Sequence, residues 1–143
     1  MPAYSDKPLW NKLGLTPGSR AVVKNTTERS LPDILAEAPF TLAPKADFFP
    51  GMNFVHLFVD KRAELARQIQ SATTFLDPAG MVWVSWPKKS AKTDTDITED
   101  TIRDVVLPMG LVDVKVCSVT DELWSGLKIV VRRENRPRGA TSA

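Results

Sequence analysis

The stretch MVWVSWPKKS, residues 81–90, joins an apolar run to side chains that could bind a ligand. Trp86 ends the run, and Lys88 and Lys89 follow directly after Pro87. An indole ring can stack on a nucleotide base, and lysine ammonium groups attract anions. The simpler alternative is a strand end, in which the tryptophan belongs to the core and the lysines are solvated. The stretch therefore raises the hypothesis of a site for an anionic ligand, such as a phosphorylated metabolite or a nucleotide.

Further candidate residues are expected at the ends of neighbouring strands. Ligands of open α/β sheets bind beyond the carboxyl ends of the parallel strands. A last strand that runs the opposite way would bring its start, with Trp124, to the same edge. The ligand-binding residues predicted for this edge are Lys24, Asn25, Thr26, Asp60, Trp86, Lys88, Lys89 and Trp124.

Other catalytic chemistries have weak support. His56 lies inside an apolar run, which is typical of a hydrogen-bonded core histidine, and Cys117 lies in an expected strand. A nucleophile elbow and a Gly-Lys-Ser/Thr phosphate loop are both missing. The acidic residues between positions 94 and 100 are explained by helix capping. We therefore predict no catalytic residue and no metal ligand.

The C-terminal segment is strongly basic. Four arginines stand against Glu134 and give this segment a local charge of about +3. Such a tail can contact nucleic acid or an acidic partner, or it can be a solvated chain end. The candidate partner-binding residues are Arg132, Arg133, Arg136 and Arg138.

Length and composition are those of one ordinary globular domain. The chain has 143 residues, of which 43% are hydrophobic and 25% charged. Its apolar runs are all shorter than the roughly 20 residues that span a bilayer, and the N-terminus does not resemble a signal peptide. A single cysteine excludes an internal disulfide. We expect a cytoplasmic protein that does not associate with membranes.

Hydrophobic periodicity predicts strands and helices in alternation. Strands are expected over residues 20–25, 40–43, 53–60, 81–86, 111–119 and 126–133, and helices over 30–38, 60–76 and 96–109. Asp60 is expected to cap the second helix, DPAG (residues 77–80) to end it, and Asp96 with Glu99 to cap the third. Helix-length connections imply parallel neighbours, and the short link TDELWS implies a final antiparallel pair. This predicts a single-domain, three-layer α/β sandwich with a mostly parallel sheet and one antiparallel strand near the C-terminus.

We expect three parts along the chain. Residues 1–19 form an N-terminal extension with a short helical turn, residues 20–134 the α/β domain, and residues 135–143 a basic flexible tail.

Four segments resemble a known family. They are FLDPAGMVWVSW, ITEDTIRD, GLVDVKVCSV and WSGLKIVVRREN. Together they are similar to a widespread bacterial family of short proteins, a domain of unknown function with a core like that of S-adenosylmethionine-dependent methyltransferases. The resemblance spans about residues 9–136 and implies a Rossmann-like fold. In FLDPAGMVWVSW, Ala79-Gly80 stands where a Gly-Gly pair is common in those enzymes.

Two features expected of the cofactor site depart from the methyltransferase pattern. The turn after the first strand, KNTTERS, contains no glycine, although backbone there must approach the ligand closely. The second strand runs into APKAD without an acidic residue at its end for the ribose hydroxyls, and Asp47 lies several residues further along. These departures favour a degenerate fold without a cofactor, acting as a non-catalytic binding or interaction module.

Two alternatives remain open. The first is a divergent S-adenosylmethionine-dependent methyltransferase that holds its cofactor through Asn25, Thr26 and Asp60. The second is an adaptor that binds nucleic acid or an acidic partner through the arginine-rich tail.

Overall fold

The structure is a computed structural model that describes residues 9–24, 39–40, 45, 47–87, 95–118, 124–132 and 134. Its five-stranded sheet has the order β1-β2-β3-β5-β4. The strands are β1 (Ala21–Lys24), β2 (Met52–Phe58), β3 (Leu76–Pro87), β4 (Leu111–Ser118) and β5 (Trp124–Val131). The helices are α1 (Leu9–Leu13), α3 (Arg62–Phe75) and α4 (Glu99–Val106), and the 3-10 turn η2 (Leu107–Met109) follows α4.

The sheet is mostly parallel, with a single reversed strand. Strands β1, β2 and β3 pair in parallel, whereas β5 pairs antiparallel with both β3 and β4. Strand β4 therefore runs in the direction of the first three. This confirms the predicted α/β class with one antiparallel strand near the C-terminus.

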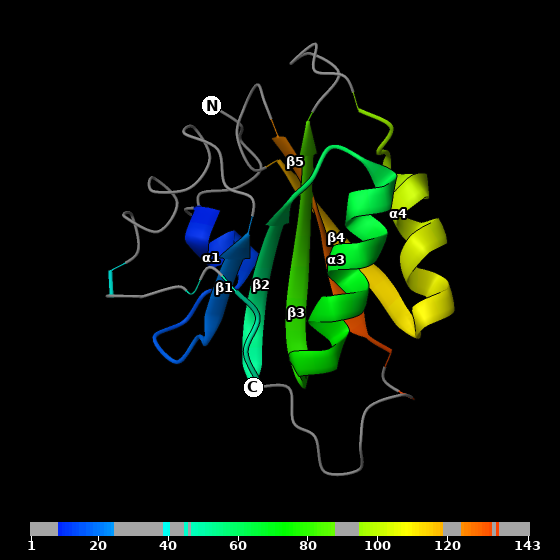
Figure 1. Ribbon diagram of the computed structural model, residues 1–143. Helices are drawn as coiled ribbons and strands as arrows, with labels where there is room; N and C mark the ends of the chain where they lie inside the picture. The colour runs from blue at the N-terminus through cyan, green and yellow to red at the C-terminus, as the bar shows by residue number, and fades with distance from the viewer. Residues whose placement is uncertain are drawn as a thin grey trace.

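Helices lie on both faces of the sheet (Figure 1). Helices α3 and α4 pack on one face through an apolar cluster that includes Leu65, Ile69 and Ile102, and it reaches all five strands. Helix α1 lies on the other face, where Leu13 packs with Phe54 and other residues in a smaller cluster. None of the described helices is long and apolar enough to cross a membrane.

The sheet continues beyond β1 by one bridge. Lys45 pairs with Val22 in parallel, on the side of β1 that faces away from β2. The predicted helix over residues 30–38 lies outside the described residues, as does most of the predicted strand over residues 40–43.

Two local predictions were wrong. The DPAG segment does not separate helix from strand, because β3 already begins at Leu76, which pairs with Met52. The predicted helix caps also differ: Lys61 is the N-cap residue of α3 and Thr98 that of α4. The Asp96 carboxylate instead accepts a hydrogen bond from the Arg62 N–H, at 2.6 Å, and so caps α3 from a distant loop.

Candidate functional site

The carboxyl ends of the parallel strands and the start of β5 meet at one edge of the sheet, as predicted. Strand β1 ends at Lys24, and Asp60 follows the end of β2. At the end of β3, Trp86 pairs with Ser125, and Pro87 pairs with Trp124. The structure thus places Lys24, Asp60, Trp86 and the backbone of Trp124 along this edge. Asn25, Thr26, Lys88 and Lys89 lie outside the described residues.

The strand connections change direction between β1 and β2. From β1 the chain goes to Lys45 on one side, whereas from β2 it goes to β3 on the other side. Ligands of open α/β sheets bind at such a topological switch point, outside the carboxyl ends of the two strands. We call the residues there, Lys24, Asp47, Phe48 and Glu64, the switch-point edge.

Asp47 lies at the switch-point edge, beside the end of β1. Its carboxylate is 3.2 Å from the Lys24 ammonium group, which also lies 4.7 Å from the centre of the Phe48 ring. Lys45 pairs with Val22, so Asp47, two residues later, lies level with Lys24, two residues after Val22. Asp47 therefore lies nearer to the end of β1 than its distance along the sequence from residues 40–43 indicated. Its side chain is 89% exposed and open to a ligand.

Glu64, in the first turn of α3, adds a second carboxylate to this edge. Hydrogen bonds from Gln68 and Arg67 lower the pKa of Glu64, and the positive charge of Lys24 contributes in the same direction. The edge therefore offers one ammonium group and two carboxylates.

Asp60 fixes the neighbouring loop through its backbone. Its carbonyl oxygen accepts hydrogen bonds from the Thr95 hydroxyl, at 2.8 Å, and from the Asp96 N–H, at 3.4 Å. The Asp60 side chain is exposed, and its predicted role as a ligand contact stays a prediction.

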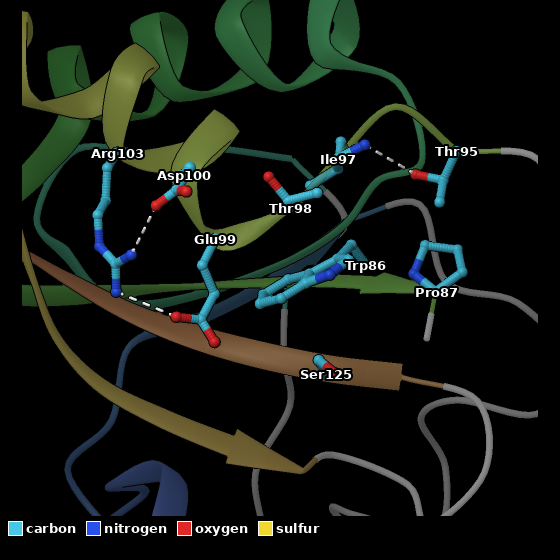
Figure 2. A pocket seen from close by; sticks show the side chains of 9 residues that line it. All are labelled: Trp86, Pro87, Thr95, Ile97, Thr98, Glu99, Asp100, Arg103 and Ser125. Carbon is cyan, nitrogen blue, oxygen red and sulfur yellow. Dashed lines mark hydrogen bonds and ion pairs between the residues drawn. The ribbon is translucent and has the colours of Figure 1, made fainter. Parts of the chain in front are cut away.

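A pocket of about 510 Å³ lies beside Trp86, between β3, β5 and α4 (Figure 2). Its volume lies within the range of roughly 300–1,000 Å³ that is usual for small-molecule sites. Trp86 is only 8% exposed and belongs to the core as well as to the pocket wall. The lining residues are Trp86, Pro87, Thr95, Ile97, Thr98, Glu99, Asp100, Arg103 and Ser125.

Arg103, which the sequence analysis missed, is the cation of this pocket. Its guanidinium group is 3.1 Å from both Glu99 and Asp100, and 2.9 Å from Asp113 on β4 (Figure 2 shows the first two contacts). The hydrogen bond to Asp113 is the main cause that raises the pKa of Arg103. The spacing of Arg103 three and four residues after the two acids was the available signal. Since three carboxylates surround Arg103, its charge is already neutralised within the protein, and Arg103 by itself is a poor anion-binding group.

The two tryptophans predicted as a platform occupy adjacent positions of the β3–β5 ladder, not facing ones. Trp86 lies opposite Ser125, and Trp124 lies opposite Pro87. A shared ligand platform of Trp86 and Trp124 stays a prediction.

His56 is a core residue, as predicted. It is 1% exposed, and its Nε2 atom is 2.7 Å from the Ser85 hydroxyl oxygen. Its ring stacks on Phe58, with 4.2 Å between the ring centres. Burial lowers the pKa of His56 to about 3, so the ring is neutral at physiological pH.

Two further findings concern the residues that the structure describes. They contain no group of three or more His, Cys, Asp or Glu side chains that could hold a metal ion.

Arg132 of the basic tail lies 3.8 Å from Glu134. Arg133, Arg136 and Arg138 are not among the described residues, and the role of the tail stays a prediction.

No protein-family model matches the sequence, and no curated protein matches it. The structure is similar to that of LepI in complex with S-adenosylmethionine, with a TM-score of 0.53 and 14% identity over 88% of this chain and 47% of that chain. It is also similar to Aeropyrum pernix fibrillarin with natively bound S-adenosylmethionine, with a TM-score of 0.51 and 16% identity over 85% of this chain and 73% of that chain.

A third similar structure is the pre-rRNA processing protein fibrillarin of Methanococcus jannaschii. Here the TM-score is 0.50 and the identity 11%, over 86% of this chain and 73% of that chain. The chain spans only about half the length of LepI. These likenesses show that the chain shares the Rossmann-like α/β fold of these proteins.

Proposed function

We propose that this chain is a divergent S-adenosylmethionine-binding domain, and that the ligand lies at the switch-point edge, outside the carboxyl ends of β1 and β2. The observation that carries the proposal is the position of Asp47, whose exposed carboxylate lies beside Lys24 at the end of β1. An acidic residue near this point of a nucleotide-binding α/β fold accepts hydrogen bonds from ribose hydroxyls. S-adenosylmethionine contains such a ribose.

The charges of the edge fit the charges of this ligand. Lys24 can attract the carboxylate of its methionine part, while Asp47 accepts from the ribose. The Lys24–Asp47 ion pair is exposed at the carboxylate end, and exposed pairs contribute only about 0–1 kcal/mol. Breaking the ion pair therefore costs little free energy, and Lys24 and Asp47 can both form contacts with a ligand instead. When bound, S-adenosylmethionine supplies an activated methyl group.

The structural comparisons support this alternative better than a non-catalytic module. LepI and Aeropyrum pernix fibrillarin, which share the fold, both hold S-adenosylmethionine. The absence of glycine from the sequence KNTTERS, residues 24–30, is the reason to regard the chain as divergent. We also propose that it belongs to the bacterial family of short proteins that it resembles and that it acts in the cytoplasm.

Calorimetric titration with S-adenosylhomocysteine tests the proposal. We expect saturable binding to the wild-type chain and about tenfold weaker binding to Asp47→Asn, because a hydrogen bond to a charged group contributes about 1.5–3 kcal/mol. The matched control is Asp104→Asn, which removes the same charge from an exposed position on α4 and should bind like wild type. Absence of saturable binding, or equal loss in both variants, would contradict the proposal.

The same titration separates the other predicted ligand class. An anionic metabolite that binds beside Trp86, as the sequence analysis predicted, should bind the wild-type chain and lose affinity on Lys88→Gln and Lys89→Gln. The affinity for S-adenosylhomocysteine should not change with these two substitutions. If phosphorylated metabolites bind and S-adenosylhomocysteine does not, the binding-module hypothesis replaces ours.

A further inference from the structure

Helix α1 covers only half of its face of the sheet. The apolar cluster under α1 contains residues of β1, β2 and β3, such as Phe54 and Trp83, and none of β4 or β5. The cluster on the opposite face extends to both of these strands through Leu111, Leu127 and Ile129. Among the described elements, therefore, no helix packs on the β4–β5 half of the α1 face.

Two lysines occupy the β4–β5 half of this face. One row of paired residues crosses the sheet from His56 through Trp83 and Lys128 to Lys115, and residues directly opposite one another share a face. Trp83 is fully buried beneath α1, where its indole N–H donates to the Leu13 carbonyl at 2.7 Å. Lys128, the next in the row, is half-buried, and Lys115 at the sheet edge is exposed. The row thus passes from core to a positively charged surface.

The two lysines repel each other. Burial lowers the pKa of Lys128, and the charge of Lys115 lowers it further. In the described part of the chain neither lysine pairs with a carboxylate, and the Lys115 ammonium group donates only to the Lys12 carbonyl, at 3.4 Å. Like charges placed directly opposite in a sheet are destabilising. An anionic partner would relieve this cost.

We infer that Lys115 and Lys128, which we call the lysine surface, bind the phosphodiester backbone of nucleic acid. One strand of nucleic acid carries about one negative charge per 3.4 Å of helix axis, so it can neutralise several neighbouring cations at once. β5 ends at Val131, and the sequence then continues with Arg132 and three further arginines, which add positive charge along the chain. The lysine surface is separate from the switch-point edge, so this inference does not depend on the proposed function.

Fluorescence anisotropy of a single-stranded oligonucleotide, measured over a series of salt concentrations, tests the inference. For the Lys115→Gln/Lys128→Gln variant of the full chain we expect about tenfold weaker binding near 0.1 M salt and a slope of log K against log salt smaller by about 1.4, which is about 0.7 for each lost phosphate contact. The matched control, Arg62→Gln/Arg67→Gln, removes two exposed charges from α3 on the opposite face and should leave affinity and slope nearly unchanged.

Thermal melting of the same variants separates binding from folding. Removing the repulsion at Lys128 should leave the melting temperature unchanged or raise it, so weaker binding with an intact fold supports the inference. If the double variant melts lower, the exposed single variant Lys115→Gln must still bind the oligonucleotide more weakly. Equal affinity of Lys115→Gln and Arg62→Gln would overturn the inference.

Two further arms identify other partners. A polyglutamate peptide of the same total charge should bind more weakly than the oligonucleotide; equal or tighter binding would indicate an acidic protein and overturn the inference. Removal of residues 132–143 should weaken oligonucleotide binding and leave part of it. If all binding disappears on this removal while the lysine variants bind like wild type, the arginine tail alone is the contact and the inference is wrong.

Discussion

His56 is enclosed in the core by Phe54, Phe58 and the Ser85 hydroxyl, and no charged group is in contact with its ring among the described residues. Its pKa of about 3 is a consequence of this burial. In the unfolded chain the pKa of the same ring is about 6.5, so the unfolded chain binds this proton at a much higher pH than the folded chain does. This single residue therefore makes folding depend on pH.

We predict that the free energy of unfolding falls as the pH is lowered from about 6.5 toward 3. In this window the unfolded chain binds one more proton than the folded chain, so the loss approaches about 1.4 kcal/mol per pH unit, or about 2 kcal/mol between pH 7 and pH 5. Urea unfolding at several pH values measures it. His56 is the only histidine, so His56→Gln should have a nearly flat profile between pH 7 and pH 5.5. If the free energy of unfolding of His56→Gln falls with pH as steeply as that of the wild type, another residue causes the pH dependence, and the prediction is wrong.

Single residues differ in how far the sequence could place them. The core position of His56 could be predicted because its apolar neighbours in the same strand are visible locally. The position of Asp47 could not, since it depends on the register of Lys45 against Val22, a pairing between distant segments. The ion pairs of Arg103 with Glu99 and Asp100 could be predicted from their spacing in one helix. Its contact with Asp113 could not, because that contact depends on how α4 packs on β4.

At the level of elements, the start of β3 is constrained by the neighbouring strand. Gly80 is buried, and a Cβ atom placed on it would lie 2.9 Å from both the Cα and the carbonyl oxygen of Asn53. These are backbone atoms of a paired strand, and they cannot move aside as the end of a flexible side chain can. The glycine that resembled part of a family turn is thus required by the close approach of β2 and β3.

We predict that Gly80→Ala lowers the free energy of unfolding by about 1–3 kcal/mol, the usual cost of overpacking. The matched control is Gly18→Ala, because a Cβ atom there meets no atom within 4 Å. Urea unfolding of both variants measures the difference. Equal stability of the two variants would show that β2 and β3 lie further apart at Gly80 than described.

Element boundaries and caps were predicted less well than element types. Each described strand and long helix lies close to a segment that hydrophobic periodicity had indicated. The caps failed because a polar side chain near a helix start has several backbone N–H groups within reach. Asp96 precedes α4 in sequence, but its carboxylate accepts a hydrogen bond from the Arg62 N–H of α3, because its loop lies against Asp60.

On the scale of the whole molecule, the strand order decides where a ligand can bind. Alternating strands and helices predicted the α/β class, and the short link before β5 predicted its reversed direction. The insertion of β5 between β3 and β4, and the bridge of Lys45 beyond β1, needed the three-dimensional structure. This strand order is why we propose a site at the switch-point edge between β1 and β2 and not at the end of β3, beside Trp86.

The most direct test of the central claim is a titration of ¹⁵N-labelled chain with S-adenosylhomocysteine, followed by amide chemical shifts. The account predicts saturable shifts of the Lys24, Asp47 and Asp60 amides, with Val114 and Val116 on the edge strand β4 as unaffected references. No saturable shift, or shifts confined to Thr98 and Ser125 in the pocket beside Trp86, would contradict a ligand site at the switch-point edge.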